Sequence, residues 1–112
     1  MSEKKPIRYL SLAAKAGRII TGLEDCEDAV KRRRKSGLLV LASDAGGNTG
    51  KHGEELTQRP GVRLMRIEYT KSELAAAVGR GSPVAIALVT DEGLAAAFAA
   101  AAANGTEQEE CQ

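Results

Sequence analysis

The segment from Thr21 to Gly37 carries the densest charge in the sequence. It begins with four carboxylates within five residues and ends with five consecutive cations: Glu24, Asp25, Glu27 and Asp28, then Lys31 to Lys35. In a helix, acids at the beginning and bases at the end stabilise the helix dipole by ~0.3–1 kcal/mol each. One or two charges at each end suffice for that effect, and five adjacent cations repel one another. The cation run is more typical of a polyanion site, so we predict phosphate contacts from Arg32 to Lys35.

A second candidate site is the glycine-rich sequence DAGGNTGKH, which lies where a phosphate-binding loop would follow a buried strand. That loop requires Gly where the chain has Ala45, and Ser or Thr where it has His52, so the metal-binding hydroxyl is absent. We therefore interpret the sequence as a turn in which Asn48 or Thr49 caps the next helix. No nucleophile can be placed beside His52 from the sequence, and we interpret this histidine as a solvent-exposed surface residue.

The sequence predicts no metal site and no cofactor. Cys26 and Cys111 lie far apart without a C-x-x-C pattern, and the chain has one histidine, too few ligands for structural zinc. Free cysteines suit a reducing cytosol. No apolar run has the length of a signal sequence or the ~20 residues of a membrane span, so we expect a cytoplasmic protein that does not contact membranes.

Positive charge is concentrated in the first half of the chain. Residues 1–53 hold 11 Lys and Arg against 6 Asp and Glu, whereas residues 54–112 hold 5 against 9, although the net charge is only +1. An anionic partner is therefore expected at the N-terminal half. Aromatic platforms for base stacking are scarce, since the chain contains two Tyr, one Phe and no Trp.

Five helices and four strands must position these residues. Apolar periodicity and Gly, Pro and capping signals predict alternating helices and strands. The predicted helices span 7–16, 23–36, 49–56, 70–79 and 91–104, and the predicted strands span 18–21, 37–44, 62–67 and 83–90. In the second helix, Glu27 with Lys31 and Asp28 with Arg32 are i,i+4 pairs. Thr70 and Glu73 have the spacing of a capping box.

Two apolar strands, in GLLVLASD and PVAIALVTDEG, are predicted to be buried on both faces, whereas the first strand is too short to lie deep in the sheet. The element order predicts an α/β fold, a three-layer α/β/α sandwich with a four-stranded mixed sheet. We expect a single domain over residues 1–105 and an acidic disordered tail over 106–112.

Three segments in this order, LAAKAGRIITG, GLLVLASDAGGNT and IALVTDEG, resemble the kink-turn RNA-binding superfamily of ribosomal proteins L7Ae and L30e. The similarity extends from Tyr9 to Phe98, and is closer to a small bacterial L7Ae-like subgroup. It implies an α/β/α sandwich without enzymatic activity that binds sharply bent RNA containing tandem sheared G·A pairs. The expected partners are structured RNA, either a kink-turn or ribosomal RNA, and the ribosome. We expect a monomer.

In this family the second helix begins with Gly, any residue, Asn and Glu, followed three positions later by a basic residue. The matching positions here are Gly22, Leu23, Glu24, Asp25 and Asp28. The resemblance implies that Gly22 lets the backbone approach the RNA, with its amide and those that follow as donors, and that Asp25 accepts from guanine. Glu24 replaces the family's amide and Asp28 replaces its cation. Arg32, one turn further along, is expected to compensate.

A second group of contacts is implied by the loop before the last strand, which in the family grips the RNA and here consists of Arg80, Gly81, Ser82 and Pro83. Lys15 and Arg18 are expected to hold phosphates together with the basic end of the second helix. Two alternatives remain: a protein-interaction module on the same fold that has lost specific RNA binding, which Asp28 favours, and a nucleotide-binding domain that uses the glycine-rich loop.

Overall fold

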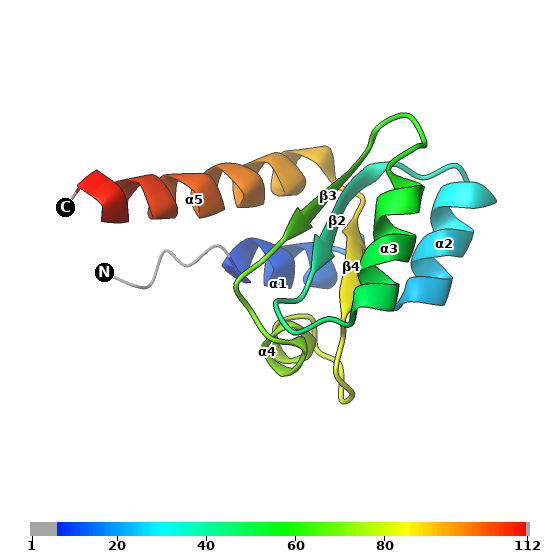
Figure 1. The fold of residues 1–112 in the computed structure, drawn as a ribbon, viewed down its shortest axis with the longest axis horizontal. Coiled ribbons are helices and arrows are strands. Elements are labelled where there is room, and N and C mark those ends of the chain that lie inside the picture. The colour runs from blue at the N-terminus through cyan, green and yellow to red at the C-terminus, as the bar shows by residue number, and fades with distance from the viewer. Residues whose placement is uncertain (1–6, 112) are drawn as a thin grey trace.

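The computed structural model describes residues 7–111, and the side chains of residues 7–102 (Figure 1). Helices and strands alternate in the predicted order. The elements are α1 (Ile7–Lys15), β1 (Ile19–Thr21), α2 (Leu23–Lys31), β2 (Gly37–Leu41), α3 (Gly47–Leu56), β3 (Val62–Arg66), α4 (Lys71–Ala77), β4 (Ile86–Val89) and α5 (Glu92–Cys111). No helix among the described residues is long and apolar enough to cross a membrane.

The four strands form one mixed sheet in the order β1-β4-β2-β3. β4 is antiparallel to both β1 and β2, and β2 is parallel to β3. Every residue of β2 and β4 is buried, as expected for the two uninterrupted apolar runs. β1 has three half-buried residues and lies at an edge, which confirms the prediction for the first strand. Arg63 and Arg66 of β3 are exposed.

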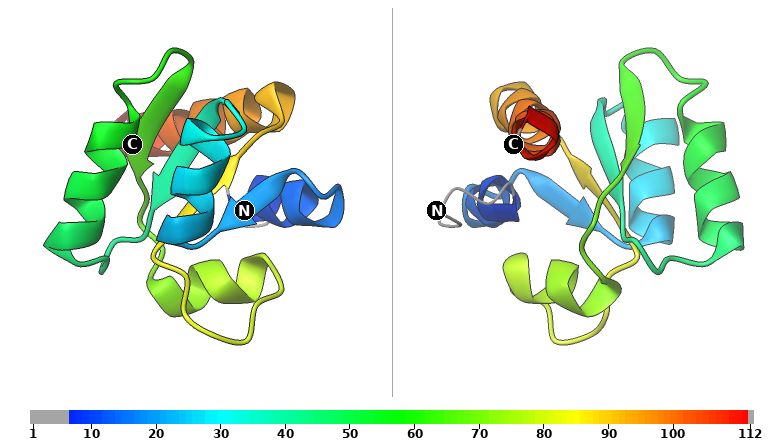
Figure 2. Two further views of the ribbon diagram at one scale, coloured as in Figure 1. Left: turned by 90° about the vertical axis from the view of Figure 1, so that its right-hand side faces the viewer. Right: turned by 60° about the vertical axis from the view of Figure 1, so that its left-hand side comes forward.

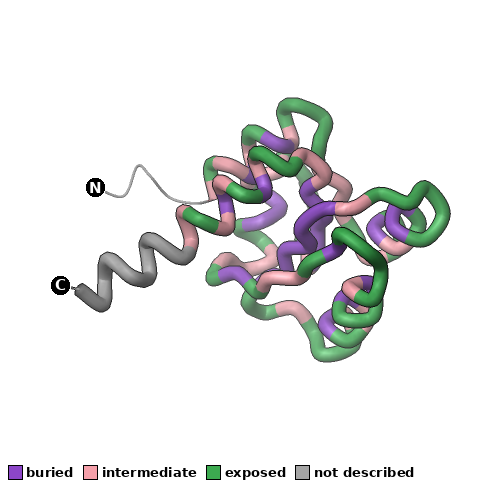
Figure 3. The backbone as a smooth tube through the Cα atoms, turned by 90° about the horizontal axis from the view of Figure 1, so that it is seen from above, coloured by how far each residue is buried: buried purple, intermediate pink, exposed green. Residues whose placement is uncertain are grey.

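Helices cover both faces of the sheet, which confirms the α/β sandwich (Figure 2). On one face, Leu10 of α1, Leu74 of α4 and Phe98 of α5 pack against β2 and β4. On the other face, α2 and α3 pack against the alternate residues of the same strands, α2 through Cys26, Ala29 and Val30. Buried residues are accordingly concentrated at the central strands (Figure 3).

α2 and α3 run side by side and in the same direction (Figure 1), because each leads into one of the two parallel strands from the same face. Their N-terminal turns therefore lie at one end of the sheet. Thr70 and Glu73 form the predicted capping box at α4, and the Asp91 carboxylate accepts from the amide of Leu94 at 3.0 Å in the first turn of α5.

Three predicted helix ends are wrong. α2 ends at Lys31, several residues before Gly37, because Arg34 adopts a positive φ of 55° and the amide of Lys35 turns back to the carbonyl of Ala29 at 2.9 Å. α3 is capped by Gly46, so Asn48 and Thr49 lie inside its first turn instead of before it. α5 continues past residue 104 and through the segment assigned to a disordered tail. The division into residues 1–105 and 106–112 stays a prediction.

The early end of α2 follows from the packing of Gly37 at the start of β2. Gly37 has a φ of 146°, and a Cβ at this position would lie 2.0 Å from the carbonyl oxygen of Val89. The amide of Gly37 also donates to the carbonyl of Gly61 at 3.0 Å. The chain must therefore leave the helix early enough to enter a narrow space between β4 and the turn before β3.

Candidate nucleic-acid interface

Gly22 joins β1 to α2 in a conformation that favours glycine. Its φ is 94° and its ψ is 142°, and a Cβ built on it would meet nothing within 4 Å. Glycine is therefore required by the backbone conformation and not by crowding. The amide of Gly22 donates to the carbonyl of Ile86 on β4 at 3.0 Å. This amide is consequently occupied within the protein, in contrast to the expectation that it would donate to RNA.

The three amides that follow Gly22 are free donors. The first intrahelical bond of α2 runs from the amide of Cys26 to the carbonyl of Gly22 at 2.9 Å, and no side chain caps this end. Within the described part of the chain, the amides of Leu23, Glu24 and Asp25 have no acceptor. These amides and the helix dipole make the start of α2 positive in potential, and the carboxylates of Glu24 and Asp25 are exposed beside them.

A hollow of about 470 Å³ lies beside this turn and brings two predicted contact groups together. Its lining includes Thr21, Gly22, Leu23, Thr49 and the segment 80–86. The loop Arg80–Pro83 is exposed along its whole length. We refer to Gly22, the first turn of α2, Thr49 and Arg80–Pro83 together as the glycine end. Thr49 joins it because α3 starts beside α2, a placement that the sequence did not reveal.

The remaining predicted contacts lie at the opposite end of the sheet. The carbonyl of Arg18 accepts from the amide of Thr90 at 2.9 Å, beyond the last residue of β4, whereas Gly22 bonds to its first residue. Arg32 follows the last residue of α2, and nine helical residues separate it from Gly22 by ~14 Å. Lys15 ends α1, three residues before Arg18. The predicted site is therefore divided between two ends of the sheet.

We call the second group the basic end and define it as Arg18, Lys31–Lys35 and Arg59. Arg59 belongs to it because it lies in the turn before β3, and this turn contacts the start of β2, where the carbonyl of Gly61 accepts from the amide of Gly37. All seven residues are exposed.

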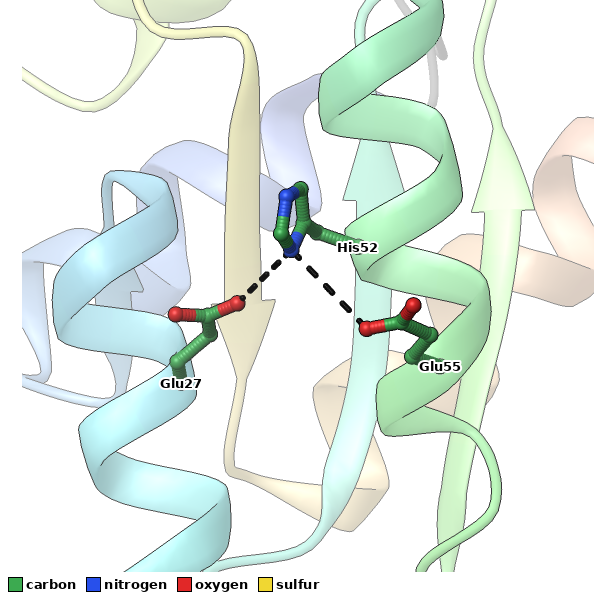
Figure 4. Close-up of polar contacts among 3 residues, drawn as sticks. All are labelled: Glu27, His52 and Glu55. Atoms are coloured by element: carbon green, nitrogen blue, oxygen red, sulfur yellow. Dashed lines mark ion pairs between the residues drawn. The ribbon is translucent and has the colours of Figure 1, made fainter.

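The charged side chains of α2 have specific partners. Arg32 pairs with Asp28, Nε to Oδ1 at 3.6 Å, which confirms one of the two predicted i,i+4 pairs. Glu27 pairs instead with His52 of α3, Oε2 to Nδ1 at 3.2 Å, and His52 also approaches Glu55 at 3.9 Å (Figure 4). His52 lies at the surface with its side chain 40% exposed, as interpreted from the sequence, and it also links α3 to α2, which the sequence did not indicate.

The glycine-rich sequence does not form a phosphate-binding loop, since Gly47–Lys51 lies within α3. Gly50 and Gly53 are buried, and a Cβ on Gly53 would lie 3.2 Å from Ile86 and 3.4 Å from Leu64. These glycines allow α3 to pack closely on the sheet. In the described residues, no group of three or more His, Cys, Asp or Glu could hold a metal ion.

Cys26 lies under the candidate interface as a buried thiol. Its sulfur donates to the carbonyl of Ile20 at 3.4 Å, and its side chain has no exposed surface. Burial, with a smaller contribution from the Asp25 carboxylate, raises the pKa of Cys26 to about 12. The thiol is therefore protonated at neutral pH, so its role is packing rather than nucleophilic chemistry.

Comparison with known proteins gives one family and many similar solved structures, two of which illustrate the range of similarity. Residues 5–99 match the ribosomal protein L7Ae/L30e/S12e/Gadd45 family. A Bacillus halodurans protein of unknown function is 28% identical, with a TM-score of 0.77 over 88% of this chain and 97% of that one. The Giardia lamblia 15.5 kD RNA binding protein is 21% identical, with a TM-score of 0.70 over 88% and 82%, and supports the fold. No curated protein matches the chain.

Proposed function

Because the chain belongs to the ribosomal protein L7Ae/L30e/S12e/Gadd45 family, we propose that it is an RNA-binding protein whose glycine end recognises a sharply bent RNA of the kink-turn type. The observation that carries the proposal is the uncapped start of α2, which follows a positive-φ glycine and borders the same hollow as the Arg80–Pro83 loop. Two chain segments far apart in sequence thus border one open surface.

The start of α2 offers donors and an acceptor at neighbouring positions. The free amides of Leu23 and Glu24 can donate to a phosphate or a base edge, and the helix dipole favours an anion there. The exposed Asp25 carboxylate can accept from the N–H groups of guanine, which a sheared G·A pair displays in the groove. Arg80 and the backbone of Gly81–Pro83 would contact the strand on the other side of the hollow.

Two acids reduce the positive potential of this surface. Glu24 and Asp28 stand where family members carry an amide and a cation, and both repel phosphate. Arg32 partly offsets Asp28 by pairing with it. The pair is weak because the Arg32 side chain is 85% exposed, so the guanidinium can exchange Asp28 for a phosphate. We therefore expect specific but moderate affinity.

The proposed setting is translation in the cytoplasm, with the protein acting as a monomer that binds a ribosomal or other structured RNA and performs no catalysis. Family membership supports this setting, since the family is described by its ribosomal proteins. The buried and protonated Cys26 thiol, which is unsuited to nucleophilic chemistry, is consistent with a binding role.

The test compares the affinity of the protein for two RNAs by fluorescence anisotropy. One RNA carries a kink with tandem G·A pairs, and the other carries Watson–Crick pairs at those positions. We expect at least tenfold tighter binding to the first, and a loss of roughly 5- to 100-fold in Asp25→Asn, since one base contact discriminates by about 1–3 kcal/mol. Glu54→Gln, an exposed acid on α3, is the matched control and should bind as the wild type does.

A second candidate is a protein-interaction module that has lost specific RNA recognition. The observation that favours it is the exposure of Glu24 and Asp25 with no basic partner at the glycine end. Equal affinity for the kinked and paired RNAs, with no binding of either below micromolar concentration, would select this candidate over the first.

A further inference from the structure

The basic end carries cations that have no role within the protein. In the described residues, the side chains of Arg18, Arg33, Arg34, Lys35 and Arg59 make no ion pair and no hydrogen bond. Two acids near this end have other partners: Asp28 pairs with Arg32, and Asp91 caps α5. The cations are therefore exposed and largely uncompensated, so they repel one another unless an anion lies against them.

Arg34 adds a second observation. It has a φ of 55°, and it is the one positive-φ residue other than glycine among those described. Glycine or asparagine occupies this backbone region at lower energy, and other helices of the chain end in glycine at such positions, Gly17 after α1 and Gly79 after α4. An arginine held in a strained turn, with its side chain exposed and without an internal partner, indicates a functional contact.

The chemistry of the basic end fits phosphate. Five of its seven residues are arginines, whose planar guanidinium groups bind phosphate oxygens in pairs. A membrane surface fits less well, because peripheral helices also insert apolar side chains, and the only exposed large apolar residue among those described is Leu12 of α1. A protein interface fits less well too, because aromatic anchors are absent from this end.

We propose that the basic end is a second RNA-binding surface, which holds the phosphate backbone of a duplex stem that continues past the glycine end. The location of the stem depends on the proposed function, whereas the affinity for duplex backbone does not. The two ends are separated by the nine residues of α2, or ~14 Å. Phosphates recur about every 3.4 Å along the axis of a B-form strand and more closely along an A-form RNA stem, so a stem must extend at least about four base pairs beyond the glycine end to reach the cations.

The test uses the triple variant Arg33→Ser, Arg34→Gly, Lys35→Ser, in which glycine relieves the strained turn. The probes are a kinked RNA with a flanking stem of about ten base pairs, the same RNA with a stem of about three, and a straight duplex. For the wild type at low salt we expect roughly tenfold tighter binding to the long stem than to the short one. The triple variant should bind both equally, and its log–log salt slope on the straight duplex should fall by about 2 to 3.

The charge-keeping variant Arg33→Lys, Arg34→Lys is the matched control and should retain most of the preference for the long stem. A thermal unfolding curve confirms that each variant is folded. An unchanged long-to-short ratio and an unchanged salt slope in the triple variant would overturn the proposal. So would wild-type binding to phosphatidylserine vesicles that the triple variant loses while its RNA binding is intact. If kinked RNA is not preferred over straight duplex, the proposed function fails, but the slope on the straight duplex still tests the basic end.

Discussion

The glycine end presents its hydrogen-bond donors from the backbone, whereas the basic end presents them from side chains. At the glycine end, the donors are backbone amides whose positions are fixed by the bond from Gly22 to Ile86 and by the start of α2. At the basic end, the donors are long side chains, and among the described residues Arg32 alone of them has an internal partner, Asp28. Amides held in fixed positions can distinguish one RNA backbone shape from another, whereas exposed guanidinium and ammonium groups bind any phosphate backbone. We therefore expect shape selectivity from one end and salt-dependent affinity from the other.

Gly22 at the glycine end and Gly37, which follows the cation run of the basic end, both have positive φ, and replacing each with alanine separates two reasons for using glycine. Gly37→Ala should destabilise the protein by at least about 3 kcal/mol, because the new Cβ would lie 2.0 Å from the carbonyl oxygen of Val89 and the strand would have to move. Urea unfolding measures the loss. A decrease below 1 kcal/mol would mean that β2 tolerates displacement at the basic end.

Gly22→Ala should cost less stability, about 1–2 kcal/mol, because only the positive φ opposes a side chain and no atom lies within 4 Å of the new Cβ. Its effect on kinked RNA should be larger, at least tenfold in Kd, since the methyl group projects into the surface that the RNA backbone approaches. Gly46→Ala at the start of α3, where φ is −67° and the space is also open, is the control and should change neither quantity appreciably. Equal effects of the two alanines would contradict a special role for the α2 turn.

Alkaline pH should affect α2, the helix that connects the two ends. The pKa of Cys26 is raised from 9.0 to about 12, so above pH 9 the unfolded thiol loses its proton while the folded one keeps it. The free energy of unfolding should fall by up to ~1.4 kcal/mol per pH unit between pH 9 and 12. Cys26→Ala, although less stable at neutral pH, should show a shallower decline. Parallel alkaline slopes for the two proteins would show that Cys26 does not titrate as expected.

Arg34→Gly should stabilise the protein, by up to about 1 kcal/mol, because glycine adopts a φ of 55° without the penalty of a side chain. Arg33→Gly removes the same charge without a positive φ and should bring no such gain. Thermal unfolding of the two variants compares strain with charge repulsion. If both stabilise equally, repulsion within the cation run, and not the turn, opposes folding at the basic end.

The smallest effect is expected for His52→Gln, which removes the imidazole that pairs with the Glu27 carboxylate. The His52 side chain is 40% exposed, so the change in stability should be within roughly 0.5 kcal/mol. Affinity for kinked RNA should not change, since His52 does not line the hollow. A tenfold loss of RNA affinity would extend the interface onto the surface between α2 and α3.

The arrangement of helices and strands followed from the sequence because each strand is either an uninterrupted apolar run or a short segment bounded by Gly, Pro or capping residues. The end of α2 did not follow from it, because that end depends on how tightly Gly37 fits against Val89, a contact between segments about 50 residues apart. Likewise, nothing in the spacing of Glu27 and His52 indicated that they would meet.

The glycine end was predicted in part, since the motif at Gly22 and the loop at Arg80 were both identified. The placement of Lys15, Arg18 and Arg32 was not. Arg18 and Gly22 are four residues apart in sequence, but strand β1 between them carries them to opposite ends of the sheet. Sequence proximity therefore suggested one site, whereas the fold places these residues in two separate groups.

The nine residues of α2 also set the distance between its first turn and the cation run. Its length is fixed at one end by the hydrogen bond of Gly22 to β4 and at the other by the entry of Gly37 into the sheet. Inserting or deleting a residue would rotate the cation run by about 100° around the helix axis and shift it by ~1.5 Å. The cations would then lie at a different distance and direction from the first turn of α2 and would suit a ligand of another shape, even with every contacting residue retained.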